Sequence, residues 1–99
     1  MIYISGKITG TTDYIQRFKS AELELNLNGY DYVVNPAVVN AQLPAVLTHK
    51  QYMKMSICML SMCDTIYMLK GWETSKGAQE ELEYAKQHNY KIIYQEGGY

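Results

Sequence analysis

The chain has 99 residues, of which 47% are hydrophobic and 19% are charged. We expect one domain over residues 1–99, because two would each be too small to sustain a core, and this composition excludes an intrinsically disordered chain. The net charge of −1 argues against binding of a nucleic acid polymer through a general positive field. No apolar run is long enough to span a bilayer, and no basic segment precedes the first strand. We therefore expect a cytoplasmic protein without a signal peptide.

Predicted strands and helices alternate along the chain. The short apolar segments predicted to be strands are residues 2–4, 32–34, 65–69 and 91–94. Helical spacing and capping residues predict helices that begin after Asp13, Thr48 and Ser75, whereas residues 36–47 are predicted to be an irregular flap. The order βαβαβαβ is typical of an open parallel sheet with helices on both faces. It predicts a three-layer α/β fold of the flavodoxin-like or Rossmann-like kind, with strand order 2-1-3-4.

The helix that begins after Thr48 is rich in methionine. Helical spacing turns toward the core the side chains of Tyr52, Met55, Met59 and Met62. Cys58 and Cys63 have neither the spacing of a zinc site nor that of a disulfide framework, so both are expected to be buried thiols. His49 and His88 have no cysteine or carboxylate at ligand spacing, so we expect surface residues. No metal and no cofactor is predicted.

Two loops are the candidate ligand site. Sheets of this kind bind ligands at the carboxyl ends of the strands where the strand order reverses, which selects residues 5–12 and 70–75. A helix that begins after Ser75 presents free N–H groups and a positive dipole end to an anion, and Gly77 permits close approach. The other interpretation is that Ser75 only caps the helix and binds no ligand. Trp72 would either cover a base at the mouth of the crevice or anchor the loop by packing.

Glu81 is the candidate for chemistry in the last helix. The residues that must pack on the sheet are Ala78, Leu82 and Ala85. Glu80 and Glu83 project to the opposite side, but Glu81 lies at the edge of the apolar stripe. Its carboxylate would point along the rim of the sheet toward the crevice, at about the reach of a nucleotide's sugar from an anion held at Ser75. The alternative is a boundary glutamate paired with a lysine.

Five short motifs carry a resemblance to a known superfamily. In chain order they are Tyr3-Ile4-Ser5-Gly6 with Ile8 and Gly10, Asn35-Pro36, Cys63-Asp64, Gly71-Trp72-Glu73, and Ser75-x-Gly77-Ala78-x-x-Glu81-x-x-x-Ala85. Together they resemble the nucleoside 2-deoxyribosyltransferase-like superfamily, and within it a short branch of bacterial and phage domains. The resemblance covers almost the whole chain and keeps the order and spacing of the motifs.

The resemblance implies a glycosyl-transfer site. In that superfamily a glutamate attacks the anomeric carbon of a nucleoside or nucleotide, and a second base or water resolves the covalent intermediate. By this resemblance Glu81 is the nucleophile, Tyr3 orients it, and Ser75 contacts a 5′-phosphate. The residues implied to shape the first loop around the ligand are Ser5, Gly6 and Gly10.

Two positions depart from the superfamily pattern. Relatives carry a helix aspartate that protonates the leaving base, but the corresponding segment here holds Ser56, whose hydroxyl does not titrate near neutral pH. Asp64 would replace that acid or serve a structural role. Lys7 stands where a small residue or proline is common, and its charge would favour a phosphate. A catalytic site and a site that binds a nucleotide without turnover therefore both stay open.

Three functions follow from these features. The first is an N-glycosidase or deoxyribosyltransferase-like enzyme that acts on a nucleoside 5′-monophosphate, a related nucleotide or a nucleoside. The second is a non-catalytic domain that senses or sequesters a nucleotide, and the third is a purely structural interaction domain. The small core and the ten tyrosines favour a homodimer or a higher homo-oligomer. Tyr99 would either reach a neighbouring subunit's site, as the resemblance implies, or belong to a frayed tail.

Overall fold

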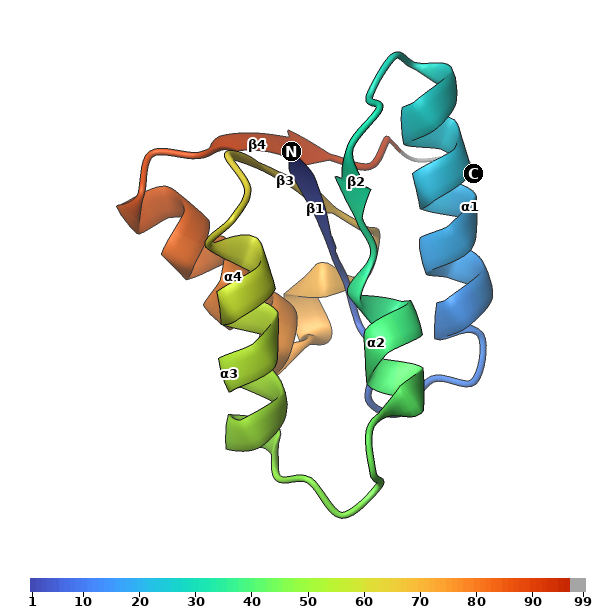
Figure 1. The fold of residues 1–99 in the computed structure, drawn as a ribbon, viewed down its shortest axis with the longest axis vertical. Coiled ribbons are helices and arrows are strands. Elements are labelled where there is room, and N and C mark those ends of the chain that lie inside the picture. The colour runs from blue at the N-terminus through green and yellow to red at the C-terminus, as the bar shows by residue number, and fades with distance from the viewer. Residues whose placement is uncertain (97–99) are drawn as a thin grey trace.

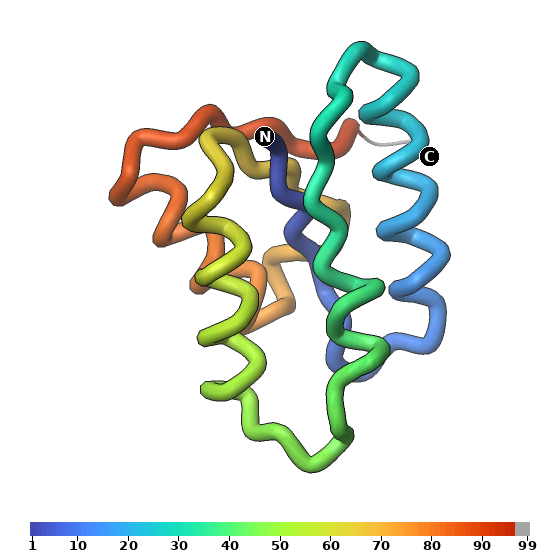
Figure 2. The backbone as a smooth tube through the Cα atoms, viewed as in Figure 1, coloured from blue at the N-terminus to red at the C-terminus, as the bar shows by residue number. Residues whose placement is uncertain are grey.

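The computed structural model describes residues 1–96 of the chain as an α/β fold built on one parallel sheet (Figures 1 and 2). The four strands are β1 (Ile2–Ser5), β2 (Val33–Val34), β3 (Thr65–Met68) and β4 (Lys91–Tyr94). All neighbouring strands are parallel, in the order β2-β1-β3-β4. The predicted fold class and strand order are confirmed. Tyr99 lies outside the described residues.

The helices cover both faces of the sheet. Their bounds are α1 (Tyr14–Leu27), α2 (Pro36–Gln42), α3 (His49–Leu60) and α4 (Lys76–Gln87), with a short 3-10 turn, η1 (Trp72–Thr74). In Figure 1 α1 and α2 lie to the right of the sheet, and α3 and α4 lie to its left. This arrangement gives three layers, as the alternation of strands and helices predicts.

Side-chain alternation along β1 and β3 divides the core into two clusters. The cluster on the side of α1 contains Ile2, Ile4, Phe18, Ala21, Leu25, Ala37, Tyr67 and Leu69. The cluster on the side of α3 and α4 contains Tyr3, Leu60, Cys63, Ile66, Met68, Ala78, Leu82 and Ala85. Every residue of β1 is buried, because this strand lies between two others and carries helices on both faces.

Residues 36–47 were predicted to be irregular, but they begin with α2. Asn35 caps this helix, since its side chain accepts a hydrogen bond from the Ala37 amide at 3.0 Å, and Pro36 occupies the first turn. An Asn-Pro pair at a helix start is a recognised signal, because proline is favoured where the amide needs no helical partner. The interpretation of Asn35-Pro36 only as a strand stop was therefore incomplete.

The predicted core face of the α3 segment is correct only in part: Met59 is half-buried and packs against the core, but other predicted positions are exposed. Met55 and Met62 are 39% and 60% exposed, and Cys58 is exposed as well. The residues of α3 that are buried are instead Ser56 and Leu60. Methionine and cysteine occur all around this helix, so apolar spacing did not distinguish its inner face from its outer face.

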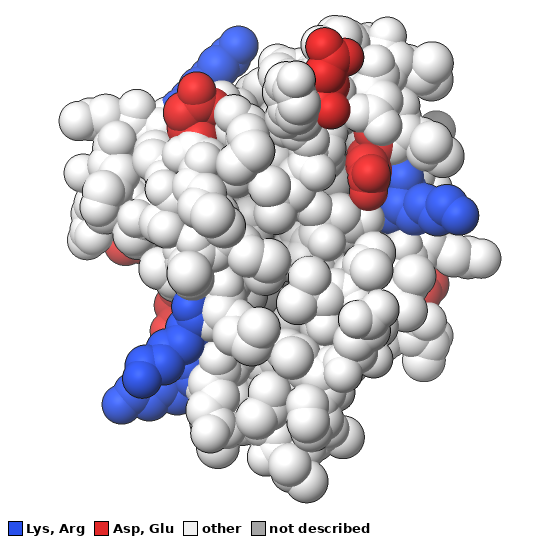
Figure 3. All heavy atoms as spheres, viewed as in Figure 1, with Lys and Arg blue, Asp and Glu red and all other residues white. Residues whose placement is uncertain are grey.

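The surface carries charges of both signs. On the face shown in Figure 3, acidic and basic side chains lie near the margins and a mostly uncharged area lies between them. That face therefore shows no continuous positive surface. Within residues 1–96, no helix combines the length and the apolar character needed to cross a membrane.

Candidate functional site

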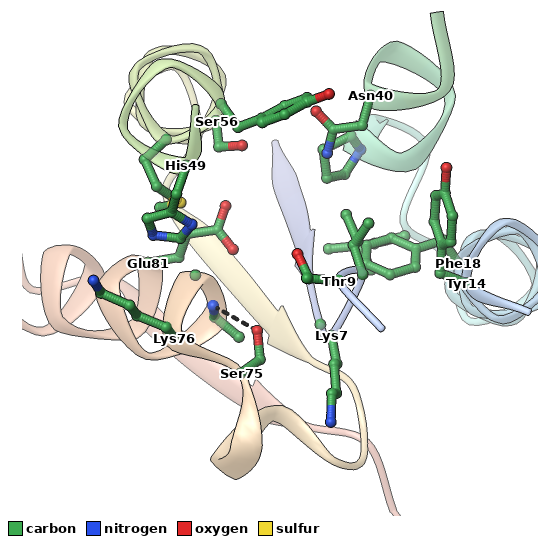
Figure 4. A pocket seen from close by; sticks show the side chains of 18 of the residues that line it. Lys7, Thr9, Tyr14, Phe18, Asn40, His49, Ser56, Ser75, Lys76 and Glu81 are labelled. Atoms are coloured by element: carbon green, nitrogen blue, oxygen red, sulfur yellow. Dashed lines mark hydrogen bonds between the residues drawn. The ribbon is translucent and has the colours of Figure 1, made fainter. Parts of the chain in front are cut away.

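A pocket of about 640 Å³ lies at the carboxyl end of β1. Both loops selected from the sequence contribute to it, the first through Gly6, Lys7 and neighbours, the second through Thr74 and Ser75. The remaining walls come from α1, α2, α3 and the start of α4. Figure 4 shows these side chains converging from opposite sides of the pocket. The expected position of the ligand site, at the reversal of strand order, therefore coincides with the largest hollow described.

Glu81 is buried at the wall of this pocket, with only 6% of its surface exposed. The Ser5 hydroxyl donates a hydrogen bond to one carboxylate oxygen at 2.7 Å, and the Tyr3 hydroxyl donates to the other. Tyr3 and Ser5 are two residues apart on β1, so both side chains leave the strand on the same face. One fully buried strand thus holds both oxygens of the carboxylate.

The environment of Glu81 favours a carboxyl group that titrates near neutrality. Burial raises the pKa of Glu81 from 4.5 to about 7, even though the hydrogen bonds from Ser5 and Tyr3 lower it. Burial and the neighbouring Glu81 raise the pKa of Tyr3 well above its ordinary value. The phenol therefore stays protonated and donates a hydrogen bond to the carboxylate. A carboxylate of this kind can act as a nucleophile or exchange a proton at physiological pH.

The start of α4 forms a positively polarised side of the pocket. Ser75 caps the helix, with its hydroxyl accepting a hydrogen bond from the Ala78 amide at 3.2 Å. Lys7 and Lys76 line the same region, and the Lys7 ammonium donates to the Thr74 hydroxyl at 3.3 Å. Two lysines beside a helix N-terminus are suited to an anion such as a phosphate. Figure 4 places Lys7, Ser75 and Lys76 along one side of the hollow.

The side of the pocket formed by α1, α2, the segment after α2 and one residue of α3, Tyr52, is apolar and aromatic. Its residues are Tyr14, Phe18, Pro36, Leu47 and Tyr52, together with Asn40. The Asn40 side-chain oxygen is buried and has no hydrogen-bond partner among the residues that the structure describes. A flat heteroaromatic ring with polar edges fits such a wall, because the rings give it contact area and the amide gives it a polar partner.

Gly77 permits close packing between α3 and α4. A Cβ atom at this position would lie 3.3 Å from the Met53 sulfur and 3.7 Å from His49 Cε1. Gly6 is under a tighter constraint, because a Cβ there would lie 2.9 Å from the Leu69 side chain. Both glycines line the pocket, as the sequence predicts, and both are also needed for packing.

Three predicted site residues lie away from the pocket. Gly10 is an exposed turn residue with φ of +80°, and Trp72 is half-buried with its ring 5.9 Å from that of Tyr94. Trp72 thus packs in the loop and does not line the described pocket. Asp64 precedes β3 at the opposite edge of the sheet, where its carboxylate pairs with the N-terminal ammonium of Met1 at 3.2 Å. That ammonium holds the pKa of Asp64 below its ordinary value.

Ser56 and His49 lie at the pocket on the side of α3. Ser56 is buried and its hydroxyl interacts with the Tyr3 phenol, so the position to which the resemblance would assign an aspartate faces the site. His49 is at the surface, as expected, but it also lines the pocket and its Nε2 lies 2.8 Å from a Glu80 oxygen. The sequence missed both this contact and Asn40, since neither pair spacing nor a motif marks them.

Metal-ligating side chains do not gather in the part of the chain that the structure describes. No group of three or more histidine, cysteine, aspartate or glutamate side chains is arranged there to hold an ion. The two cysteines are free thiols, one exposed and one buried. The polar side chains that line the pocket include a carboxylate, hydroxyls, amines and an imidazole.

Comparison with known proteins places the chain in a family without assigning an activity. No curated protein matches the chain. A family model described as a domain of unknown function (DUF4406) matches residues 1–94, nearly the whole chain, and the chain therefore belongs to this family.

Proposed function

We propose that this chain is an N-glycosidase or a deoxyribosyltransferase-like enzyme of the nucleoside 2-deoxyribosyltransferase-like superfamily. Its substrate is a nucleoside 5′-monophosphate or a related nucleotide. Glu81 attacks the anomeric carbon, and water or a second base then releases the sugar from the enzyme.

The burial and the partners of Glu81 are the observation that carries this proposal. A carboxylate at the wall of an open pocket, with one hydroxyl on each oxygen, has a fixed direction and is shielded from bulk water. Burial disfavours the charged form, so the ionised carboxylate is more reactive than one at the surface. An ordinary structural role would call for a cationic partner, but the side chains bonded to Glu81 are the neutral hydroxyls of Tyr3 and Ser5.

The distribution of chemistry around Glu81 supports a nucleotide. The helix N-terminus with Lys7 and Lys76 suits a 5′-phosphate, and the aromatic side suits a base. Glu81 lies on the wall between these regions, where the sugar of a bound nucleotide would be (Figure 4). The superfamily resemblance likewise assigns the phosphate to Ser75 and the anomeric carbon to Glu81.

A panel of ribonucleoside and deoxyribonucleoside 5′-monophosphates tests the proposal. The purified chain should release free base from at least one member, as followed by chromatography. Glu81→Gln should abolish release, whereas Glu83→Gln, an exposed change on the same helix, should leave it unchanged. Absence of base release across the whole panel, at protein concentrations near those of the nucleotide, would overturn the enzymatic proposal.

Ser56 favours a second candidate, a domain that binds a nucleotide without cleaving it. Among the described residues that line the pocket, Glu81 is the only carboxylate, so the helix aspartate of the superfamily has no acidic replacement at this wall. A binder of this kind should show a higher melting temperature with a monophosphate that is recovered intact. Glu81→Gln should then keep its affinity. A melting curve that no nucleotide shifts would remove this candidate.

A further inference from the structure

The lining of the pocket includes a histidine that the superfamily resemblance does not use. We propose that His49, held in place by Glu80, is the general acid that protonates the departing base. This inference rests on the proposed function and identifies the group that takes over the task of the missing helix aspartate.

The position of His49 is fixed from two helices. It is the first residue of α3, and its Nε2 lies 2.8 Å from an oxygen of Glu80, which belongs to α4. The imidazole packs against the start of α4, with its Cε1 3.7 Å from where a Cβ of Gly77 would stand, which is an ordinary contact distance. Figure 4 shows the ring beside Glu81 and Lys76 on the pocket wall.

The pairing with Glu80 leaves one ring nitrogen for the ligand. Glu80 accepts a hydrogen bond from the Nε2–H group, so an imidazolium carries its second proton on Nδ1. No hydrogen-bond partner of Nδ1 is found within residues 1–96. A carboxylate on one nitrogen orients the ring, which is the arrangement that histidine general acids commonly use.

Other ionisable groups of the pocket are poorly suited to this step. The Lys7 ammonium donates to the Thr74 hydroxyl and the Tyr52 phenol donates to the Pro44 carbonyl, so both groups already have hydrogen-bond acceptors within the protein. The pKa of Tyr3 is raised, and its proton is committed to Glu81. Histidine is the side chain that ordinarily gains and loses a proton between about pH 5 and 8.

In the proposed step, a Glu81 oxygen forms a bond to the anomeric carbon while the bond from that carbon to the base nitrogen breaks. The electron pair of the broken bond goes to the base, which takes the proton of the His49 imidazolium and leaves neutral. A water molecule then attacks the anomeric carbon, displaces the Glu81 carboxylate and returns a proton to His49. The free sugar phosphate and the starting enzyme result.

Because the His49–Glu80 pair is partly exposed, its effect on catalysis can be distinguished from an effect on stability. The side chains of His49 and Glu80 are 44% and 46% exposed, and ion pairs in such positions add little to stability. Their contact is therefore not explained as a support of the fold. Substitution of either residue should leave the melting temperature nearly unchanged, so an effect on catalysis can be measured in a folded protein.

Leaving-group dependence tests the proposal. We would compare His49→Gln with the parent chain on each monophosphate cleaved in the panel, and on 4-nitrophenyl 2-deoxyribofuranoside 5-phosphate, whose phenolate departs without protonation. The expected kcat falls by about 10²- to 10⁴-fold on the nucleotide but by less than about tenfold on the nitrophenyl substrate. His88→Gln, an exposed change at the far end of α4, is the matched control and should leave both rates unchanged.

Glu80 is assigned as a positioning residue and needs its own variant. Glu80→Gln should lower kcat on the nucleotide, but by less than His49→Gln does, and should again change kcat on the nitrophenyl substrate little. Glu83→Gln should leave kcat unchanged on both substrates. Equal losses on both substrates, or a His49→Gln rate within threefold of the parent on the nucleotide, would overturn the role of His49 alone. A parent chain that cleaves neither substrate would overturn the proposed function, and this inference with it.

Discussion

Replacement of Glu81 by glutamine should stabilise the folded protein above neutral pH. The pKa of the Glu81 carboxyl is raised by burial from 4.5 to about 7, so the folded state binds this proton more tightly than the unfolded chain does. The associated stability is fully present below pH 4.5 and is lost as the pH rises through 7. Because glutamine cannot ionise, the variant does not lose it.

The magnitude follows from the two pKa values. Each pKa unit corresponds to about 1.4 kcal/mol, so full ionisation of Glu81 in the folded protein costs about 3 kcal/mol relative to the unfolded chain. Near pH 4.5 parent and variant should therefore have similar free energies of unfolding. At pH 8.5 the variant should be more stable by up to about 3 kcal/mol, or about 10–20 °C in melting temperature for a domain of this size.

Urea unfolding at pH 4.5, 6, 7 and 8.5 measures this difference. Other titrating groups are common to both chains and cancel when the two free energies are subtracted. Glu83→Gln is the control, since its side chain is exposed and should give a difference that stays flat with pH. Parallel curves for parent and Glu81→Gln, or a parent that gains stability relative to the variant as pH rises, would refute the reasoning.

Three further substitutions test the site and its supports. Tyr3→Phe removes a hydrogen bond that lowers the pKa of Glu81, so the midpoint of the acidic limb of kcat/KM should move to higher pH; an unchanged midpoint would contradict this. Gly6→Ala places a Cβ 2.9 Å from the Leu69 side chain and should destabilise by about 1–3 kcal/mol in urea unfolding, an effect that a fully stable variant would disprove. Thr48→Ala breaks the capping box of α3 and should lower the free energy of unfolding by about 1 kcal/mol in the same measurement. An unchanged free energy of unfolding would contradict this role of the cap.

The sequence was most informative where polar and apolar residues contrast. In α4, charged residues alternate with alanine and leucine at helical spacing, so the buried face and the inward position of Glu81 could be predicted correctly. In α3 the contrast is absent, because Met55 and Cys58 are apolar but exposed. The buried serine on that helix therefore could not be found from its spacing.

Contacts between distant segments account for what the sequence missed at the site. The pairing of His49 with Glu80 joins residues 31 positions apart, and it depends on how closely α3 packs on α4. Asn40 reaches the pocket only because the segment after Asn35 is a helix, which the prediction lacked. For Trp72 the sequence left two roles open, and the observed position of its ring, 5.9 Å from that of Tyr94, agrees with the loop anchor rather than with a residue that lines the pocket.

The location of Tyr3 and Ser5 on the central strand has a consequence for how the candidate site responds to a loss of stability. Their backbone amides belong to the part of the sheet that is most deeply enclosed, so they should exchange with deuterium only through global unfolding. The strand that holds the Glu81 carboxylate is then intact in every folded molecule. A destabilising substitution far from the pocket should reduce the number of folded molecules without altering the site in those that remain.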